Sequence, residues 1–215
     1  MTRFARLALV LTLVEVVPAS AQTASDSGTF VIRHARDTVA TERFNRTETQ
    51  LEGTLALRDP KKTNQGYRAI VAPDQTLPLI EVTVREGTDS AGRKARVTQR
   101  ARVIFKEDSA AVDAVGGDGL QTRLFATERG AVPYLNLSFA LLEQAVRRAR
   151  AAPDTGRVAF FNLGGGQTVM ARLSRLDADS LRLDIGGVEY HLRVDSAGRV
   201  LGGRIPSQNV VAERW

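Results

Sequence analysis

One stretch of this chain has the pattern of an α-helix, and it lies in a sequence that otherwise alternates like β-strands. From Ser138 to Ala151, apolar residues recur at steps of three and four and fall on one stripe of a helix. Glu143, Gln144 and three arginines fall off that stripe. Asn136 or Ser138 can cap the start of the helix. Because a lone amphipathic helix cannot bury its own apolar stripe, the chain needs a sheet for this helix to pack on.

Strand patterns fill most of the remaining sequence. The stretch 107–119 is acidic and rich in Ala and Gly, and we interpret it as an exposed loop. Gly186-Gly187 has the form of a two-residue hairpin turn. We therefore predict a mainly β fold, a curved antiparallel meander (half-barrel or clam) with the amphipathic helix packed on its concave face. Alternation of apolar and polar residues predicts strands at 29–34, 39–46, 50–58, 67–72, 79–85, 95–106, 120–127, 132–137, 157–163, 168–176, 181–185, 188–194 and 199–205.

The N-terminus has the three parts of a secretory signal peptide. Arg3 and Arg6 precede an apolar run from Leu7 to Val17, and Ala19-Ser20-Ala21 matches a signal-peptidase site. We expect cleavage after Ala21 and a periplasmic or secreted protein. An uncleaved N-terminal anchor is the alternative, although the apolar run is shorter than the roughly 20 residues that span a bilayer.

This leader divides the chain into three parts. Residues 1–21 are the predicted signal peptide, and 22–28, with Ser, Thr, Asp and Gly, is predicted to be a flexible mature N-terminus. The remainder, 29–215, is long enough for one β-rich domain with a core of useful size.

Composition excludes several classes of site. The chain has no cysteine, so disulfides, thiolate zinc sites and cysteine nucleophiles are excluded together. The net charge is +6, but the arginines are scattered along the predicted strands instead of forming one run with interleaved aromatic residues. We expect no nucleic-acid partner. An arginine-rich face for an anionic membrane surface stays open as an alternative.

No motif carries a recognisable catalytic or cofactor chemistry. Asp154-Thr155-Gly156 spells the aspartic-protease tripeptide, but it follows a helix end instead of an apolar strand, so a turn is favoured. His34 and His191 lack the third ligand that a metal site requires. Gly164-Gly165-Gly166 lacks the Lys-Ser/Thr of a phosphate-binding loop and is interpreted as a hairpin loop. We expect no catalytic residue, no metal and no cofactor.

The order of elements resembles that of the periplasmic half-barrel families of diderm bacteria. Several uncharacterised exported families have strands, then an amphipathic helix that ends in arginines, then a compact strand block, and this order resembles Ser138 to Arg150 followed by Arg157 to Ile205 here. It is also distantly similar to the lipoprotein-localisation carriers. That resemblance implies an antiparallel sheet curled around a helix that plugs an apolar cavity.

Three hypotheses for function follow from these patterns. The first is a non-enzymatic cell-envelope protein that holds an apolar or lipid-like ligand between sheet and helix. The second is a structural or interaction module whose arginine-rich face meets anionic partners, and the third is an envelope hydrolase that uses Asp154 or the histidines. The oligomeric state is left open. Under the first hypothesis, the predicted ligand-binding residues are Phe139, Leu142 and Val146 on the helix and Phe105, Tyr190 and Leu192 on the sheet.

Overall fold

The computed structural model describes residues 25–87, 95–151 and 156–215. Fifteen strands, one α-helix and one short 3-10 helix are present in these residues. In chain order they are β1 (Asp26–His34), β2 (Asp37–Arg46), β3 (Gln50–Leu57), β4 (Asn64–Ile70), β5 (Leu79–Glu86), β6 (Arg96–Phe105), β7 (Ser109–Gly116), β8 (Gly119–Ala126), β9 (Val132–Tyr134), α1 (Phe139–Ala151), β10 (Arg157–Asn162), β11 (Thr168–Asp177), β12 (Ser180–Ile185), β13 (Val188–Val194), β14 (Val200–Ile205), η1 (Pro206–Gln208) and β15 (Val210–Arg214).

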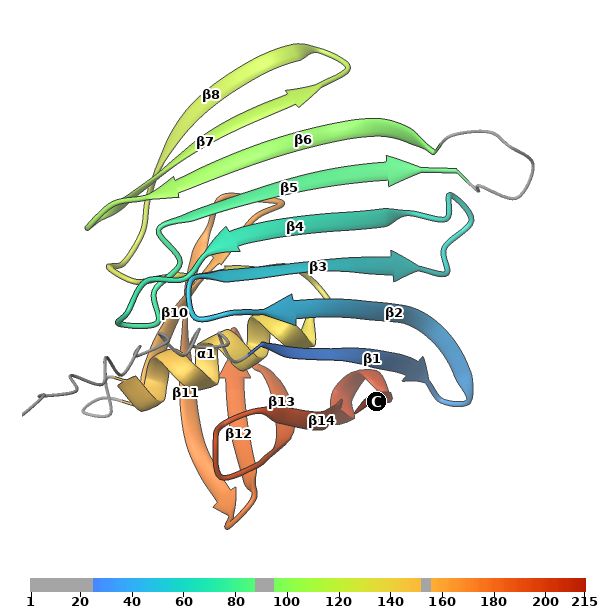
Figure 1. Cartoon of the computed structure of the whole chain (residues 1–215), viewed down its shortest axis with the longest axis vertical. Coiled ribbons are helices and arrows are strands. Elements are labelled where there is room, and N and C mark those ends of the chain that lie inside the picture. The colour runs from blue at the N-terminus through green and yellow to red at the C-terminus, as the bar shows by residue number, and fades with distance from the viewer. Residues whose placement is uncertain (1–24, 88–94, 152–155) are drawn as a thin grey trace, which may run out of the picture.

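All fifteen strands belong to one sheet built from two meanders (Figure 1). One meander runs from β1 to β8 and the other from β10 to β15, and the first and last strands of the described chain join them. Phe30 on β1 lies opposite Arg214 on β15, and the backbone N–H of Trp215 donates to the carbonyl of Thr29 at 2.9 Å. The sheet is therefore continuous through its two chain ends, while β8 and β9 lie at its opposite edges.

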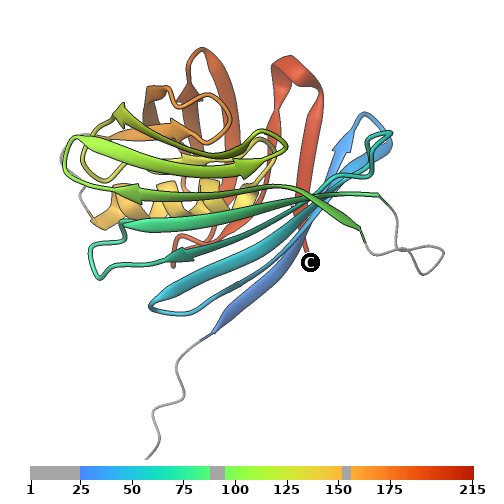
Figure 2. The same cartoon turned by 90° about the horizontal axis from the view of Figure 1, so that it is seen from above.

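The helix lies in the connection between β9 and β10, which are the one parallel pair among the strands of the described residues. Parallel neighbours need a crossover connection, and α1 supplies it. The sheet curls so that α1 lies inside it, between the β5–β8 side and the β10–β12 side (Figure 2). The predicted fold class, a curved and mainly antiparallel sheet with one helix, is confirmed.

The apolar stripe of the helix is packed against the inner face of the sheet. Phe139, Leu142 and Val146 are 0%, 3% and 0% exposed. The Phe139 ring lies 5.5 Å from that of Phe30 on β1, measured between centroids. Gly203 on β14 permits a close approach here, because a Cβ at this position would lie 3.0 Å from the Phe139 ring. The helix stripe and the strands around it form a solid core.

Two sequence-based interpretations near the helix need correction. Glu143 and Gln144 were placed off the apolar stripe, yet both are fully buried. Their polar atoms are paired inside the curl, which makes that burial possible. The flexible N-terminus was predicted to extend through 28, but β1 already begins at Asp26 and pairs there with β2.

The prediction of an exposed loop at 107–119 is wrong. Most of it is β7, which forms a hairpin with β8. Ala110 is fully buried, and Asp113 lies on the opposite face. The alternation of inward apolar and outward polar residues is therefore present, but the inward residues are small. The last strand, β15, was also not predicted, because Val210 to Arg214 is short and follows a 3-10 turn.

Truncation of the helix stripe tests the packed core. We expect Leu142→Ala to lower the free energy of unfolding by about 2–5 kcal/mol, because it opens a cavity against the sheet. Leu124→Ala provides the matched control: Leu124 on edge strand β8 is 73% exposed, and its truncation should cost less than about 0.5 kcal/mol. Urea denaturation followed by circular dichroism measures both values. Equal losses in the two variants would contradict the packing described.

Candidate functional site

The six residues predicted to bind a ligand lie in the packed interior. Phe139, Leu142, Val146, Tyr190 and Leu192 are no more than 3% exposed, and Phe105 is half-buried. The Phe105 ring stands edge-on to Phe161 at 5.5 Å. The Tyr190 hydroxyl is hydrogen-bonded to that of Tyr134 at 2.8 Å. What the structure shows of these side chains is mutual packing, and the open volume of the concave face lies elsewhere.

That open volume is a cleft of about 180 Å³ on the β6–β8 side of the curl, which we call the concave cleft. Its floor consists of side chains that face one another in register across three strands: Ala101, Ala114 and Gln121 form one row. Two of these are alanines, so the floor is low and leaves space above it. The cleft is lined by Gln99, Ala101, Val112, Ala114, Gln121, Arg123, Phe125, Leu163, Gly164, Gly165 and Gly166.

The roof of the concave cleft is the loop between β10 and β11. The Asn162 side chain accepts a hydrogen bond from the backbone N–H of Gly164 at 3.0 Å, and its carbonyl accepts one from Gly166 at 2.8 Å. Gly166 has a φ of 73°, and a Cβ there would collide with the Phe125 ring of β8. Glycine is required at this position because it combines a left-handed backbone with direct contact to an aromatic ring.

Edge strand β8 meets β10 and β11, near the other end of the open sheet, beside this loop. The Thr168 hydroxyl on β11 donates to the Ala126 carbonyl of β8 at 3.3 Å and lies 2.8 Å from the Thr127 hydroxyl. Phe125 also packs against Phe161 of β10, with ring centroids 5.9 Å apart. These contacts hold the roof over the floor without backbone pairing between the two edges.

The lining of the concave cleft mixes apolar and polar side chains. Ala114, Val112 and Phe125 supply the apolar surface, whereas Arg123 donates a hydrogen bond to Gln121 at 2.9 Å. Such a lining suits a ligand with a small apolar part and a polar end. Sequence reasoning missed it because the loop interpretation of 107–119 hid β7. The usable signal was the alternation of small apolar residues at 110, 112 and 114.

The two histidines lie on different strands, β1 and β13, of the part of the chain that the structure describes. His191 contacts Glu189 at 3.3 Å and accepts a hydrogen bond from Arg204, whereas His34 lies at the far end of β1. No group of three or more His, Cys, Asp or Glu residues there could hold a metal ion. Asp154 lies outside the described residues. Within the described ranges, no helix is long and apolar enough to cross a membrane.

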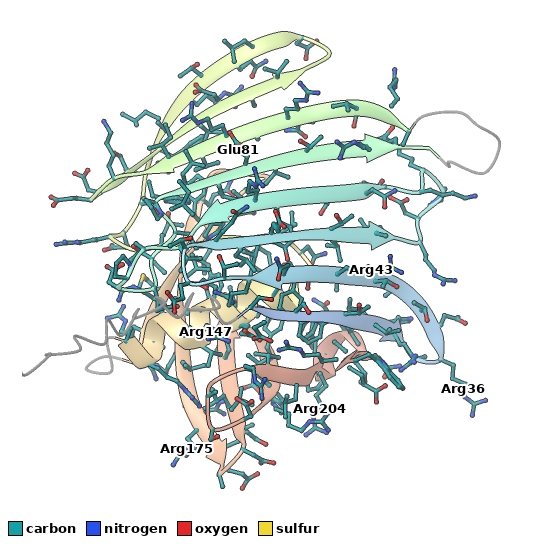
Figure 3. All side chains as sticks on the ribbon, in the orientation of Figure 1. Arg36, Arg43, Glu81, Arg147, Arg175 and Arg204 are labelled. Atoms are coloured by element: carbon teal, nitrogen blue, oxygen red, sulfur yellow. The ribbon has the colours of Figure 1, made fainter. Side chains whose placement is uncertain are left out.

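The convex face of β3–β7 carries several of the arginines on which the prediction of an anionic partner was based. Five residues lie in register across these strands with alternating charge, namely Glu52, Arg68, Glu81, Arg102 and Asp113. Glu81, at the centre of this row, is labelled in Figure 3. Arg68 lies 3.5 Å from Glu52. Because opposite charges face one another, this row is largely self-neutralising. The arginine-rich face for anionic partners stays a prediction.

A buried carboxylate from the sheet holds the start of the helix. Ser138 caps the helix by accepting from the Leu141 N–H at 3.3 Å, as one of the two predicted caps. Glu42 on β2 accepts hydrogen bonds from the Ser138 hydroxyl at 2.5 Å, the Tyr67 hydroxyl at 2.7 Å and the Ala140 N–H at 3.0 Å. Despite these donors, complete burial raises the pKa of Glu42 above its ordinary value.

This raised pKa predicts a pH-dependent stability. The native state holds the Glu42 proton more tightly than the unfolded state does, so its contribution is complete below the ordinary pKa of 4.5 and is lost as pH rises through the native pKa. The free energy of unfolding of the wild type, taken relative to Glu42→Gln, should therefore fall with rising pH by up to about 1.4 kcal/mol per pH unit. Urea denaturation of both proteins between pH 4 and 8 measures the difference. A difference that rises with pH would contradict this assignment.

Comparison with known proteins adds a fold relationship. No family model matches the sequence, and no curated protein matches it. A crystal structure of a DUF1089 family protein from Pseudomonas aeruginosa superposes with a TM-score of 0.54 over 80% of this chain and 91% of that one, at 17% identity. At this identity the likeness shows the fold alone. The fold is thus shared with a protein of an uncharacterised bacterial family, and no comparison links the chain to the lipoprotein-localisation carriers.

Proposed function

We propose that this protein is a non-enzymatic binding protein of the bacterial cell envelope that holds an apolar or lipid-like ligand in the concave cleft. The observation that carries the proposal is the unfilled volume between the β6–β8 floor and the glycine loop that roofs it, with Ala114, Val112 and Phe125 as its apolar surface. Curved sheets that their own side chains do not fill are frequent ligand sites.

The location differs from the one expected from the sequence. A ligand between α1 and the sheet would have to displace Phe139, Leu142 and Val146, which are nearly or fully buried. The concave cleft needs no such displacement. Its volume of about 180 Å³ is below the roughly 300–1,000 Å³ typical of pockets for drug-sized ligands. The cleft therefore takes one apolar end of a ligand, and the polar end lies at the rim near Arg123.

Its lining favours binding over chemistry. Among the described residues that line the cleft, Arg123 is the titratable one, and an arginine stays protonated across the physiological pH range. An acid–base pair or an activated nucleophile needs at least two groups within hydrogen-bond reach of each other. Residues suited to those roles are not among the lining side chains, which supports a non-enzymatic role.

Filling the concave cleft tests the proposal. Ala114→Trp on β7 places an indole in the cleft, and we expect it to weaken binding of an apolar fluorescent probe, N-phenyl-1-naphthylamine, at least about tenfold, since it removes most of the apolar volume. Val115→Trp is the matched control, because Val115 is the next residue on the same strand, is 48% exposed and faces the convex side. Fluorescence titration gives both affinities, and circular dichroism checks folding. Probe binding that is unchanged in Ala114→Trp would refute the cleft as the ligand site.

Export is the second part of the proposal and has its own test. The signal-peptide pattern predicts that the protein expressed with its own leader in a diderm host is recovered from the periplasm or medium with Gln22 as its first residue. N-terminal sequencing of the fractionated protein measures this. Recovery of intact protein beginning at Met1 from the cytoplasmic fraction would contradict an envelope role.

A further inference from the structure

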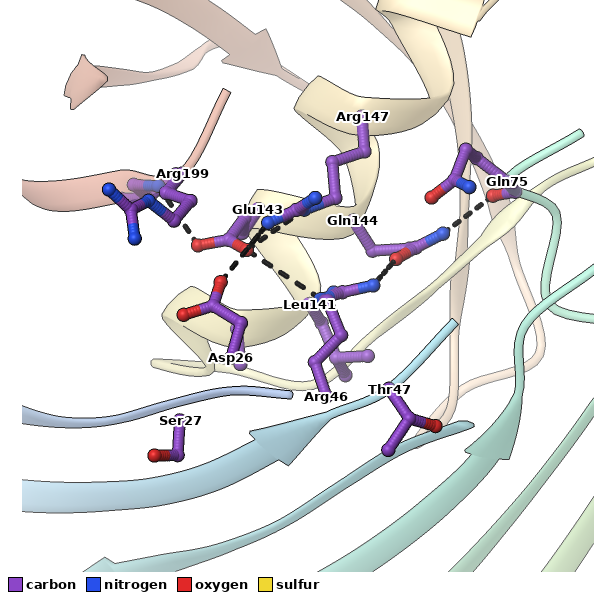
Figure 4. Close-up of polar contacts among 12 residues, drawn as sticks. Asp26, Ser27, Arg46, Thr47, Gln75, Leu141, Glu143, Gln144, Arg147 and Arg199 are labelled. Carbon is purple, nitrogen blue, oxygen red and sulfur yellow. Dashed lines mark hydrogen bonds and ion pairs between the residues drawn. The ribbon is translucent and has the colours of Figure 1, made fainter. Parts of the chain in front are cut away.

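A polar site lies on the other side of the helix, where buried and partly buried charges from four elements meet (Figure 4). Arg46 comes from β2, Arg147 from α1 and Arg214 from β15, and the carboxylates among them belong to Glu143 on α1 and Asp26 on β1. We call these five residues the buried charge cluster. It holds three cations and two anions, so it carries one surplus positive charge.

Two of the arginines fully engage both carboxylates. Glu143 accepts from Arg147 Nε at 3.0 Å, from Arg214 Nη1 at 3.1 Å and from the backbone N–H of Val200 at 2.9 Å. Asp26 accepts from Arg147 at 3.2 Å and from Arg214 at 2.5 Å. Each carboxylate therefore already has an arginine on both of its oxygens.

Arg46 is the arginine of this cluster whose guanidinium N–H groups are not all hydrogen-bonded. Its side chain is 5% exposed, and its Nε lies 3.6 Å from Glu143, beyond hydrogen-bond distance. Its Nη1 donates to the Gln144 side chain, which itself donates to the Gln75 carbonyl at 2.6 Å. Its Nε and Nη2 donate no hydrogen bond to any residue in the described ranges. Burial lowers the pKa of Arg46 to about 10, against the opposing effect of Glu143. A buried guanidinium with unpaired N–H groups is costly unless an anion completes it.

The pocket beside this guanidinium is large enough for such an anion. It has a volume of about 400 Å³, and Arg46, Arg147 and Arg199 line it together with Thr47, Gln75 and Ala197. Asp26 and Glu48 also line the pocket, but Asp26 is held by two arginines and Glu48 is exposed at the rim. Arginine forks on several sides suit a group with several anionic oxygens, as phosphate has.

We propose that this pocket binds a phosphate group, free or as an ester, which lies beside the buried Arg46 guanidinium, compensates its charge and contacts the arginines that line the pocket. The pocket shares no lining residue with the concave cleft, so the site does not depend on the proposed function. An anion here supplies the negative charge that the buried charge cluster lacks. Arg199 at the rim is already paired with Asp195, at 2.6 Å between Nε and the carboxylate, so Arg46 is the cation that most needs the anion.

Binding of defined phosphates tests the site directly. The full-length mature protein is titrated by calorimetry with inorganic phosphate and, separately, with dihexanoyl phosphatidylglycerol below its micelle concentration. Binding of inorganic phosphate alone identifies a free phosphate, and binding of the lipid, alone or as well, identifies a headgroup; either result supports the site. Binding of neither overturns the proposal. We expect Arg46→Gln to weaken binding at least about tenfold, whereas Arg43→Gln on the exposed face of β2 should leave it unchanged.

A second variant separates ligand binding from folding. Ala197 is exposed at the rim of the pocket, so Ala197→Glu should fold normally while its carboxylate excludes the phosphate. The midpoint of thermal unfolding provides a further measurement. It should rise with phosphate in the wild type, beyond the rise with chloride at equal ionic strength, and should not rise in either variant. Affinities for phosphate in Arg46→Gln and Ala197→Glu that equal the wild-type value would overturn the proposal.

Discussion

The curl of the sheet depends on one helix that buries polar groups as well as its apolar stripe. Glu42 reaches from β2 to the N-terminus of α1, and Glu143 on α1 ties that helix to Arg214 on β15. Ion pairs this deeply buried repay their desolvation only when the geometry is fixed. They therefore position the helix between the two meanders, and apolar packing against Phe30 supplies the bulk of the stabilisation.

A helix held in this way divides the inside of the curled sheet into a packed region, an open cleft and a charged pocket. Over β1 and β14 its apolar side chains are buried in direct contact with the sheet. Beyond its reach, over β6–β8, alanines line the inner face and the concave cleft remains. On the polar side of the helix, the buried charge cluster has one more arginine than carboxylates. Arg46 is the arginine whose charge stays incompletely paired. Both proposed sites are thus consequences of where α1 packs and where it does not.

The fold class and most strands could be predicted from the sequence because alternation of large apolar residues is a local signal. β5, β12 and β13 follow that alternation and were placed within a residue or two. β7 was missed because the residues of its inner face are Ala and Val, which give a weaker alternation than large apolar residues do. The site could not be predicted, because it depends on register: only the pairing of β6, β7 and β8 brings Ala101, Ala114 and Gln121 together. The burial of Glu143 was equally beyond sequence reasoning, because its partner Arg214 is 71 residues away in the chain.

The most direct measurement is a crystal structure of the protein purified without denaturation from an exporting diderm host, paired with mass spectrometry of its organic extract. The account predicts an extracted apolar or lipid-like compound and matching electron density between β6–β8 and the Gly164–Gly166 loop. It also predicts unbroken packing between α1 and the sheet. A ligand-free concave cleft, with density instead between Phe139 and Phe30, would contradict it.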